Sequence, residues 1–515
     1  MQIFWLKRNL RLQDSEPFFE SMRAFRKKGK VLPLYCHEPE LIQQSDVSRQ
    51  HQLFIQETLE ELDRDIQLIG GKLFQAVGET VDVLDRIHRV HPLTKIWTHQ
   101  ETTQNSQFQR DKAVAAWCAA NGVELQELAQ NGIARGSQKS ELFPSYFARS
   151  VSSKLRDPMG TDLSERFAPL PFPSCEPKAI PAAAGNDKPL RQKGGRSQAI
   201  KNLNRFFTVP HLKKYPFQIS SPNTAWQGCS RISTYLAYGI VSDREIFQAV
   251  DQVVTDAHSR MNADQFGKFQ ENARFYLDRL SWRRQYMQTF ETSPELEFQC
   301  MLPQFNGVRE ADFFSPHSSA HSSAQSEKHF TAWKQGLTGF PYIDAAMRFL
   351  NQTGWINMRL RATVVSFATM NLWIPTTKVA EYLATEFLDY EPGIHYVIHQ
   401  LIAGTTEFSE LMVYDPVKQG RDQDFEGHFI RKWVPELANV SGPELHDLAR
   451  TAFSLSKHAE NLGYTPYPEA IVDHRATAKK AKDRVSELRL SDSDRQKALA
   501  KKMIKKAEDV QRSLF

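Results

Sequence analysis

Three arginines interrupt an otherwise apolar helical pattern between residues 333 and 437. Arg348, Arg359 and Arg361 lie among apolar residues at helical spacing, and Asp389 and Glu391 follow one predicted helix later. A guanidinium group placed in a core requires an anionic partner or a bound anion. The pattern therefore indicates either an internal network of ion pairs or a large, phosphate-bearing ligand inside a helical bundle.

A second candidate anion site precedes another predicted helix. The run Cys229-Ser230-Arg231-Ile232-Ser233 combines free backbone N–H groups, serine hydroxyls and a guanidinium fork, all of which suit a phosphate. Serine is also an ordinary residue at the start of a helix. Taken alone, this run leaves the two interpretations at even odds.

A third candidate combines a tryptophan with basic residues in the helical pattern 275–291. Trp282 is followed by Arg283 and Arg284. An aromatic ring flanked by cations can stack on a base and hold its phosphates. For this segment alone, a core tryptophan with two snorkelling arginines is the better interpretation.

The elements that position these residues fall into four predicted segments. Over 1–132, strand patterns alternate with helical patterns, which predicts a parallel, doubly wound α/β sheet. Residues 133–200 form a long linker rich in Pro and Gly, and 201–465 form an almost wholly helical domain. Residues 466–515 form a basic helical tail, either solvated or in contact with nucleic acid. The strand patterns are at 3–6, 31–36, 72–77, 95–99 and 123–128.

Composition limits the class of protein. The net charge of +5 is compatible with a polyanionic partner. No apolar stretch is long enough for a membrane span, and the N-terminus does not resemble a signal peptide. The five cysteines lack metal-site spacing, and His317 and His321 lack a third ligand, so we expect no metal and a cytoplasmic location.

Taken in order, these segments resemble the photolyase/cryptochrome flavoproteins over nearly the whole chain. The matching motifs are FWLKRNLRLQD (4–14), Tyr215-Pro216, CSRIS with YLAYGIVSDR (229–244), WRRQY (282–286), and the most specific signature, Trp333 to Arg348. The resemblance implies FAD in the helical domain. It places the flavin diphosphate near Tyr215 and residues 229–233, and Arg361, Asp389 and Glu391 near the isoalloxazine.

The chain departs from the family pattern in its electron-transfer residues. Of the three tryptophans of the usual chain, only the outer one matches, at Trp333, whereas His399 and Thr376 occupy the other two places. Trp373 and Tyr396 are therefore candidates for another route, although each is also an ordinary packing residue. The segments LDYEPGIHY and YDPVKQGRDQD resemble the bacterial branch with an iron–sulfur cluster. Ala346 stands at one cluster-cysteine place, and no cysteine follows Cys300, so we expect no cluster.

The resemblance leaves two functions open. One is a DNA photolyase, a lyase that repairs UV-induced pyrimidine dimers by electron transfer from light-excited reduced FAD. Trp282 would then stack on the lesion, with Arg279, Arg283 and Arg284 at the DNA. The alternative is a cryptochrome, a blue-light receptor that signals to a partner. Arg279 stands where photolyases that repair cyclobutane dimers have a glutamate, which leaves the lesion type open. The N-terminal domain of this family often holds an antenna chromophore. Residues 97–105 follow a strand and are a candidate place for one, but the sequence distinguishes neither its identity nor a bound chromophore from an empty site.

Overall fold

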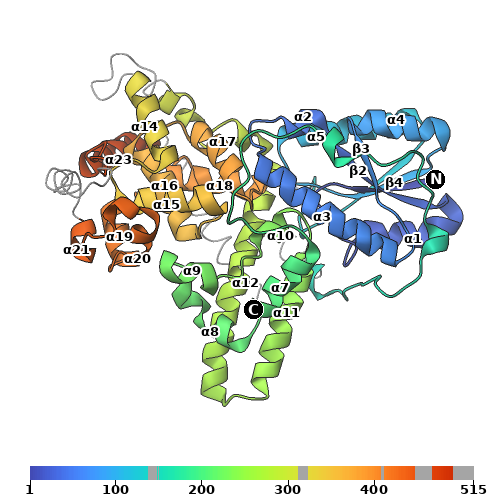
Figure 1. Ribbon diagram of the computed structural model, residues 1–515, viewed down its shortest axis with the longest axis horizontal. Coiled ribbons are helices and arrows are strands. Elements are labelled where there is room, and N and C mark those ends of the chain that lie inside the picture. Colours follow the sequence, from blue (N-terminus) through green and yellow to red (C-terminus); the bar gives the residue numbers. More distant parts are fainter. Residues whose placement is uncertain (137–147, 149, 311–322, 407–410, 447–466, 491–515) are drawn as a thin grey trace.

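The computed structural model describes residues 1–136, 148, 150–310, 323–406, 411–446 and 467–490. A sheet domain lies at one end of the molecule and a helical domain at the other (Figure 1). In the described residues, no helix has both the length and the apolar character needed to cross a bilayer.

Five parallel strands form the sheet in the order β3-β2-β1-β4-β5. The order reverses direction at β1, with β2 on one side and β4 on the other, as in doubly wound folds. The prediction of this fold is confirmed. The strands are β1 (Gln2–Leu6), β2 (Val31–His37), β3 (Phe74–Val77), β4 (Lys95–His99) and β5 (Glu124–Leu128).

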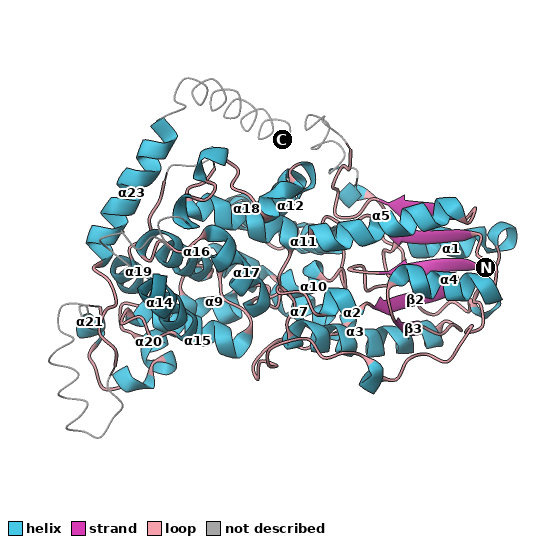
Figure 2. Ribbon diagram, turned by 90° about the horizontal axis from the view of Figure 1, so that it is seen from above, coloured by secondary structure: helices cyan, strands magenta, loops and turns pink. Residues whose placement is uncertain are grey.

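Alternation of side chains along β1 builds a core on each face of the sheet. Phe4 and Leu6 pack with Phe18 and Phe54, whereas Ile3 and Trp5 belong to a separate cluster with α4 and α5. Helices therefore cover both faces: in Figure 1, α4 and α5 lie above the sheet and α1 and α3 below it, whereas Figure 2 shows the strands side by side. These helices are α1 (Glu16–Lys28), α2 (Pro39–Ile42), α3 (Arg49–Leu68), α4 (Thr80–Val90) and α5 (Asn105–Ala120).

Where it is described, the connection between the domains contains little regular structure, yet hydrogen bonds attach it to both domains. It includes short 3₁₀ turns at Ser164–Arg166 and Pro177–Ala179. Backbone hydrogen bonds attach Cys175 to Gln75 in the sheet domain and Leu190 to Gln352 in the helical domain. The connection therefore reaches both domains.

Helix α12 (Ala263–Thr292) is the central element of the helical domain. It is 30 residues long, begins at the Asn262 cap, and packs against α18 and α8. A π-helical turn, Phe367–Asn371, follows α16. The other helices are α7 (Arg196–Phe206), α8 (Val209–Gln218), α9 (Pro222–Gly228), α10 (Ser233–Ala237), α11 (Asp243–His258), α14 (Ser323–Gln335), α15 (Pro341–Thr353), α16 (Met358–Ser366), α17 (Thr376–Glu386), α18 (Pro392–Ala403), α19 (Pro416–Gln423), α20 (His428–Trp433), α21 (Gly442–Leu445) and α23 (His474–Leu490).

Helix α23, in the predicted tail, is docked on the helical domain. Ala481 and Val485 are buried beside Leu302, Phe305 and Met370. Because one face of α23 is buried, this part of the tail does not fit the solvated alternative. The rest of the predicted tail, 491–515, lies outside the described residues, as do His317 and His321.

Candidate functional site

Arg231 is clamped between two tryptophans. Its guanidinium carbon lies 3.8 Å from the ring centroid of Trp226 and 4.1 Å from that of Trp355. The residue is only 6% exposed, and its Nε has no hydrogen-bond partner in the described chain. Burial lowers the pKa of Arg231 to about 10. A poorly solvated cation with an unused donor suits an anionic ligand.

Polar groups from distant segments hold Arg231 in place. Its Nη2 donates to Gln192 Oε1 at 3.2 Å, and Gln192 Nε2 donates to the Arg231 carbonyl at 2.8 Å. The Arg231 backbone has a φ of 56°, a left-handed conformation that a non-glycine residue keeps only when its surroundings enforce it. These contacts and this backbone conformation therefore fix the position of the Arg231 side chain.

The other residues predicted for the diphosphate gather around Tyr276. The Tyr276 hydroxyl donates to Ser230 Oγ at 3.3 Å, and its ring meets that of Tyr215 edge-on at 5.1 Å. Ile232 is buried in the same apolar cluster as Tyr215, and Ser233 begins α10. The Cys229 carbonyl accepts a hydrogen bond from Arg205 Nη2 at 2.8 Å. Tyr215 and residues 229–233 thus form one region.

Asp389 and Glu391 are each paired with an arginine. Arg361 Nη2 lies 2.5 Å from Asp389 Oδ1, and Arg283 Nη2 lies 2.7 Å from Glu391 Oε2. Burial raises the pKa of Glu391, with Arg283 and Arg8 opposing that rise. Outside this group, Arg348 forms a bidentate pair with Glu436, at 2.8 and 2.9 Å. The ion-pair alternative from the sequence therefore applies to Arg348 and Arg361.

Arg283 and Arg284, which the sequence predicts at the DNA, are each paired with a carboxylate in this structure. Arg284 is 1% exposed, and its Nε lies 2.9 Å from Asp243 Oδ2. Arg283 forms an ion pair with Glu391 and also lies 3.5 Å from Asp243. Burial would raise the pKa of Asp243, but Arg284 and Arg283 hold it below its ordinary value. The helical period turns these two side chains inward, where they join α12 to the start of α11 and of α18.

Trp282 and Arg279 face the other way. Trp282 is 46% exposed, and the Arg279 guanidinium carbon lies 4.2 Å from its ring centroid. Arg279 also lies 4.4 Å from the Phe275 ring centroid. An exposed ring with a stacked cation is available to a base or a phosphate.

The three candidate electron-transfer residues lie in separate places. Trp333 is fully buried and stacks on Phe330 with ring centroids 5.8 Å apart. Tyr396 instead stacks on Phe290 at 5.7 Å. Trp373 packs with the cluster around α23, and the Arg309 guanidinium carbon lies 4.6 Å from its ring centroid.

His399 is paired with His395, and both rings are buried. Their centroids are 4.1 Å apart, and His399 Nδ1–H donates to the His395 carbonyl at 2.7 Å. That bond leaves His399 Nε2 as a buried acceptor with no partner among the described groups. Burial lowers the pKa of His399 to about 4 and that of His395 well below its ordinary range. Both rings are therefore neutral near pH 7.

Known families match both domains of the chain. Residues 276–487 match the FAD binding domain of DNA photolyase, and residues 2–138 match DNA photolyase. The chain belongs to the photolyase/cryptochrome family. As a member of that family, it has FAD as the cofactor of its helical domain.

Relatives of this photolyase/cryptochrome chain span almost its full length. A deoxyribodipyrimidine photo-lyase of Alkalihalophilus pseudofirmus is 24% identical over 93% of this chain and 97% of that protein. A cryptochrome of Synechocystis sp. PCC6803 has a TM-score of 0.77 at 20% identity, covering 94% of this chain and 98% of that chain. An archaeal photolyase from Sulfolobus tokodaii with two FAD molecules has a TM-score of 0.72 at 24% identity, covering 94% and 99%. At these identities the solved structures show the fold alone.

The residues present fit the diphosphate of FAD. Arg231 offers a buried, unused donor without an ion-pair partner in the described chain, and the Ser230 and Ser233 hydroxyls lie in the same run. Trp226, Trp355, Gln192 and Tyr276 complete this region, and sequence reasoning missed all of them. Trp226 and Trp355 lie far apart in the chain, so only the tertiary structure shows that they clamp one guanidinium.

A cavity lies at the carboxyl ends of the strands, close to the candidate place for an antenna chromophore. Its volume is about 130 Å³, and Arg8, Glu101, Gln104, Arg110 and Tyr390 are among its lining residues. Arg110 pairs with Glu101 at 2.8 Å in its wall. The volume is below the roughly 300–1,000 Å³ of typical small-molecule sites. A second chromophore would therefore require these side chains to move.

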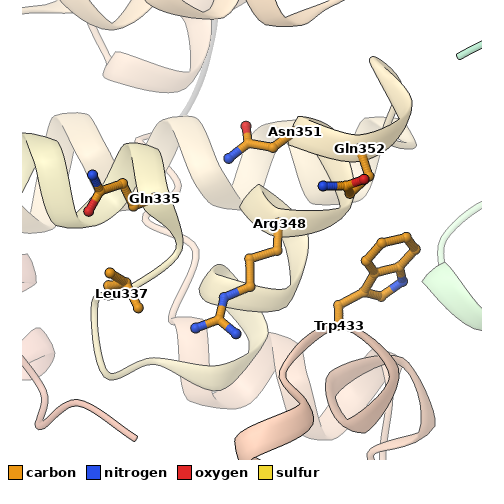
Figure 3. A pocket seen from close by; sticks show the side chains of 6 residues that line it. All are labelled: Gln335, Leu337, Arg348, Asn351, Gln352 and Trp433. Carbon is orange, nitrogen blue, oxygen red and sulfur yellow. The ribbon is translucent and has the colours of Figure 1, made fainter. Parts of the chain in front are cut away.

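Figure 3 shows another pocket, about 380 Å³ in volume, on the helical domain. Arg348 and Trp433 are among the side chains that line it. Arg348 donates its Nε–H to the Gly336 carbonyl as well as pairing with Glu436. Because this guanidinium is already satisfied, the pocket lacks the unused cation found at Arg231.

Proposed function

We propose that this chain is a light-driven flavoprotein of the deoxyribodipyrimidine photolyase type, which repairs UV-induced pyrimidine dimers in DNA. The observation that carries the proposal is that the two faces of α12 have different contacts. Its exposed face presents Trp282 and Arg279, while its inner face is tied through Arg283 to Glu391, a residue predicted beside the flavin. One helix would thus connect a surface for a damaged base with the cofactor site.

FAD would be held by residues of the helical domain. Arg231, Ser230 and Ser233 would bind the diphosphate, with Tyr215, Cys229 and Ile232 packed around them. Arg361, Asp389 and Glu391 would orient the polar edge of the isoalloxazine. When bound and reduced, FAD supplies the electron that splits the dimer on illumination. The buried surroundings would exclude water from this electron transfer.

DNA carrying a UV lesion would bind at Trp282. A damaged base pair is easier to open than an intact one, which favours the lesion. The Trp282 ring would stack on the extruded bases, and Arg279 would contact a phosphate or the bases themselves. With Arg283 and Arg284 turned inward, other basic residues must supply the remaining affinity for the DNA backbone.

The direct test is lesion loss under light. Reduced protein would be illuminated with DNA containing cyclobutane dimers or 6-4 products, and each lesion would be counted. Loss of one lesion type supports the proposal and identifies the substrate. Loss of neither, with the flavin still photoreduced, would overturn it.

Substitution of Trp282 tests the proposed lesion contact. Trp282→Ala should cost about 1–3 kcal/mol of affinity for damaged DNA if the ring stacks on a base. Phe425→Ala serves as the control, because Phe425 is an aromatic residue 60% exposed elsewhere on the helical domain. Damaged-DNA affinity that is equal in the two variants would remove Trp282 from the interface.

A cryptochrome-type blue-light receptor is the second candidate. The inward-facing Arg283 and Arg284 favour it, because they remove two cations from the expected DNA surface. His399 and Thr376 favour it as well, since they replace the usual electron-transfer tryptophans. A receptor would show reversible flavin photoreduction without repair, together with light-dependent binding of a signalling partner.

We also propose an electron donor, domain limits, a cellular location and a place for an antenna chromophore. Photoreduction would use Trp333, Trp373 or Tyr396 as electron donor. The domain limits would be 1–132, 133–200, 201–465 and 466–515. The unpaired cysteines fit a cytoplasmic location. An antenna chromophore, if bound, would occupy the cavity lined by Glu101 and Arg110.

A further inference from the structure

Two tyrosines and an aspartate form a buried, hydrogen-bonded chain across the junction between the domains. Tyr396 lies in α18, Tyr390 precedes that helix, and Asp46 lies between α2 and α3 of the sheet domain. The Tyr396 and Tyr390 hydroxyl oxygens are 3.1 Å apart, and the Tyr390 hydroxyl lies 2.9 Å from Asp46 Oδ2. All three residues are buried.

The chain has a defined direction. A phenol has one O–H donor, and Tyr390 gives its own to Asp46. Tyr396 must therefore donate to the Tyr390 oxygen. The Gln104 amide donates to the same Asp46 oxygen, so the carboxylate is held as the acceptor at the end of the chain.

The environment makes Asp46 a better base than an exposed aspartate. Burial raises the pKa of Asp46, and the hydrogen bond from Tyr390 only partly opposes the rise. Burial also raises the pKa of both phenols, so they carry their protons at rest. Tyr390 and Gln104 line the cavity of about 130 Å³ at the sheet edge, which lies beside the acceptor end of the chain.

The other end of the chain reaches rings near the predicted flavin residues. The Tyr396 and His395 ring centroids are 5.5 Å apart, and His395 lies 4.1 Å from His399. The guanidinium carbon of Arg361, which pairs with Asp389, lies 4.0 Å from the Phe387 ring centroid, and the Phe387 and His395 ring centroids are 6.1 Å apart. Tyr396 thus joins the hydrogen-bonded chain to the aromatic packing around the proposed cofactor site.

We propose that Tyr396, Tyr390 and Asp46 form a proton-coupled redox relay. Tyr396 gives one electron to the light-excited, oxidised flavin and its phenolic proton to Tyr390, while Tyr390 passes its own proton to Asp46. The products on the protein are a neutral Tyr396 phenoxyl radical, an unchanged Tyr390 and a protonated Asp46. The relay rests on the proposed function, because the flavin is the oxidant.

The physical reason for coupling the two transfers is the cost of buried charge. Removal of an electron alone would leave a phenol radical cation in a poorly solvated site. Transfer of the proton to Asp46 neutralises the radical and the carboxylate together. Trp333 has no comparable proton acceptor, since its buried Nε1–H has no hydrogen-bond partner among the described groups.

The experiment compares light-induced radicals in the FAD-loaded full chain with the oxidised cofactor. Flash absorption and electron paramagnetic resonance would identify the radical, and Tyr396→Phe should abolish the tyrosyl signal. Asp46→Asn keeps the shape of the acceptor but not its basicity, so the rate of tyrosyl formation should fall by about 100-fold, the scale of a lost general base. The wild-type rate should also slow in D₂O, and this isotope effect should vanish in Asp46→Asn.

Two further variants test the proton pathway: one interrupts it at Tyr390, and the other is a control outside it. Tyr390→Phe removes a single hydroxyl from the relay and should slow tyrosyl formation as Asp46→Asn does. It provides the test if Asp46→Asn folds poorly. Asp63→Asn is the matched control, because Asp63 is another aspartate of the sheet domain that accepts a hydrogen bond from a glutamine amide, that of Gln67 at 2.8 Å. It should leave the tyrosyl rate unchanged.

The possible failures are distinguishable. A tryptophanyl radical, or a tyrosyl rate that is unchanged in both Asp46→Asn and Tyr390→Phe, would overturn the relay and leave the proposed function intact. A wild-type chain that takes up no FAD would overturn both.

Discussion

Arg231 and Arg284 are both buried arginines, and their surroundings give them different roles. Arg284 has a carboxylate partner in Asp243, so its charge is part of the helix packing. Arg231 has aromatic rings and an amide instead, with one donor left unused. The same residue type is therefore structural in one place and suited to a ligand in the other.

Replacement of Arg231 should weaken the cofactor site. Arg231→Met should reduce FAD affinity by roughly 10- to 150-fold, because a hydrogen bond to a charged group contributes about 1.5–3 kcal/mol. Quenching of flavin fluorescence during titration of the apoprotein would measure the change. Arg348→Met, which removes an arginine paired with Glu436, should leave FAD affinity unaltered. Equal affinities for the two variants would contradict the assignment of Arg231.

Replacement of Arg284 should affect stability and not DNA binding. Arg284→Met should lower the free energy of unfolding by up to about 3–5 kcal/mol, because the buried Asp243 loses its 2.9 Å ion pair and keeps the longer, 3.5 Å contact with Arg283. The double variant Arg284→Met/Asp243→Leu should recover part of this loss, as urea unfolding would show. The dependence of DNA affinity on salt should not change. A shallower salt dependence in Arg284→Met would return Arg284 to the DNA surface.

At the scale of elements, long helices carry different functions on opposite faces. Helix α12 exposes Trp282 while burying Arg284 two positions later, since successive residues on a helix point about 100° apart. Helix α23 likewise buries Val485 and exposes Lys482. The part of α23 that is described thus contributes to the core of the helical domain despite its basic composition.

Disruption of the buried face of α23 should release this helix. Val485→Asp places a charge among Leu302, Phe305 and Met370, and should cost roughly 2–4 kcal/mol of stability. Hydrogen exchange should rise in α23 and in the π-helical turn that it contacts. Lys482→Asp, on the exposed face of the same helix, should change stability by no more than about 0.5 kcal/mol. Similar exchange in both variants would mean that the docking contributes little.

At the scale of the whole molecule, buried polar contacts join the two domains. His51 of the sheet domain donates its Nε2–H to the Phe387 carbonyl of the helical domain at 2.9 Å. Glu291 of α12 accepts hydrogen bonds from Thr102 and Arg135. Tyr390 reaches Asp46 across the same junction. Because separated domains would leave these groups unpaired or newly hydrated, we expect the domains to stabilise one another.

Acid should destabilise the molecule through histidines in both domains. Burial lowers the pKa of His51 and of His399 to about 4 in the folded chain. Between pH 6.5 and pH 4, these histidines are therefore protonated in the unfolded chain but neutral in the folded chain. The stability they contribute is complete above the unfolded pKa of about 6.5 and is lost as the pH falls from there towards 4, by about 1.4 kcal/mol per pH unit for each residue. Urea unfolding between pH 7 and pH 5 would measure this slope. His51→Gln and His399→Gln should each make it shallower, and an unaltered slope would contradict the prediction.

The sequence by itself determined the fold class, the family and the cofactor. Alternating strand and helix patterns, and motifs such as 333–348, depend on local spacing that can be read along the chain. Only the tertiary structure decided which charges are neutralised, and by what. The clamp of Trp226 and Trp355 on Arg231, the inward turn of Arg283 and Arg284, and the contact of Tyr390 with Asp46 all join residues far apart in sequence. The free energy of a buried charge depends on its neighbours in space, which the order of residues along the chain does not specify.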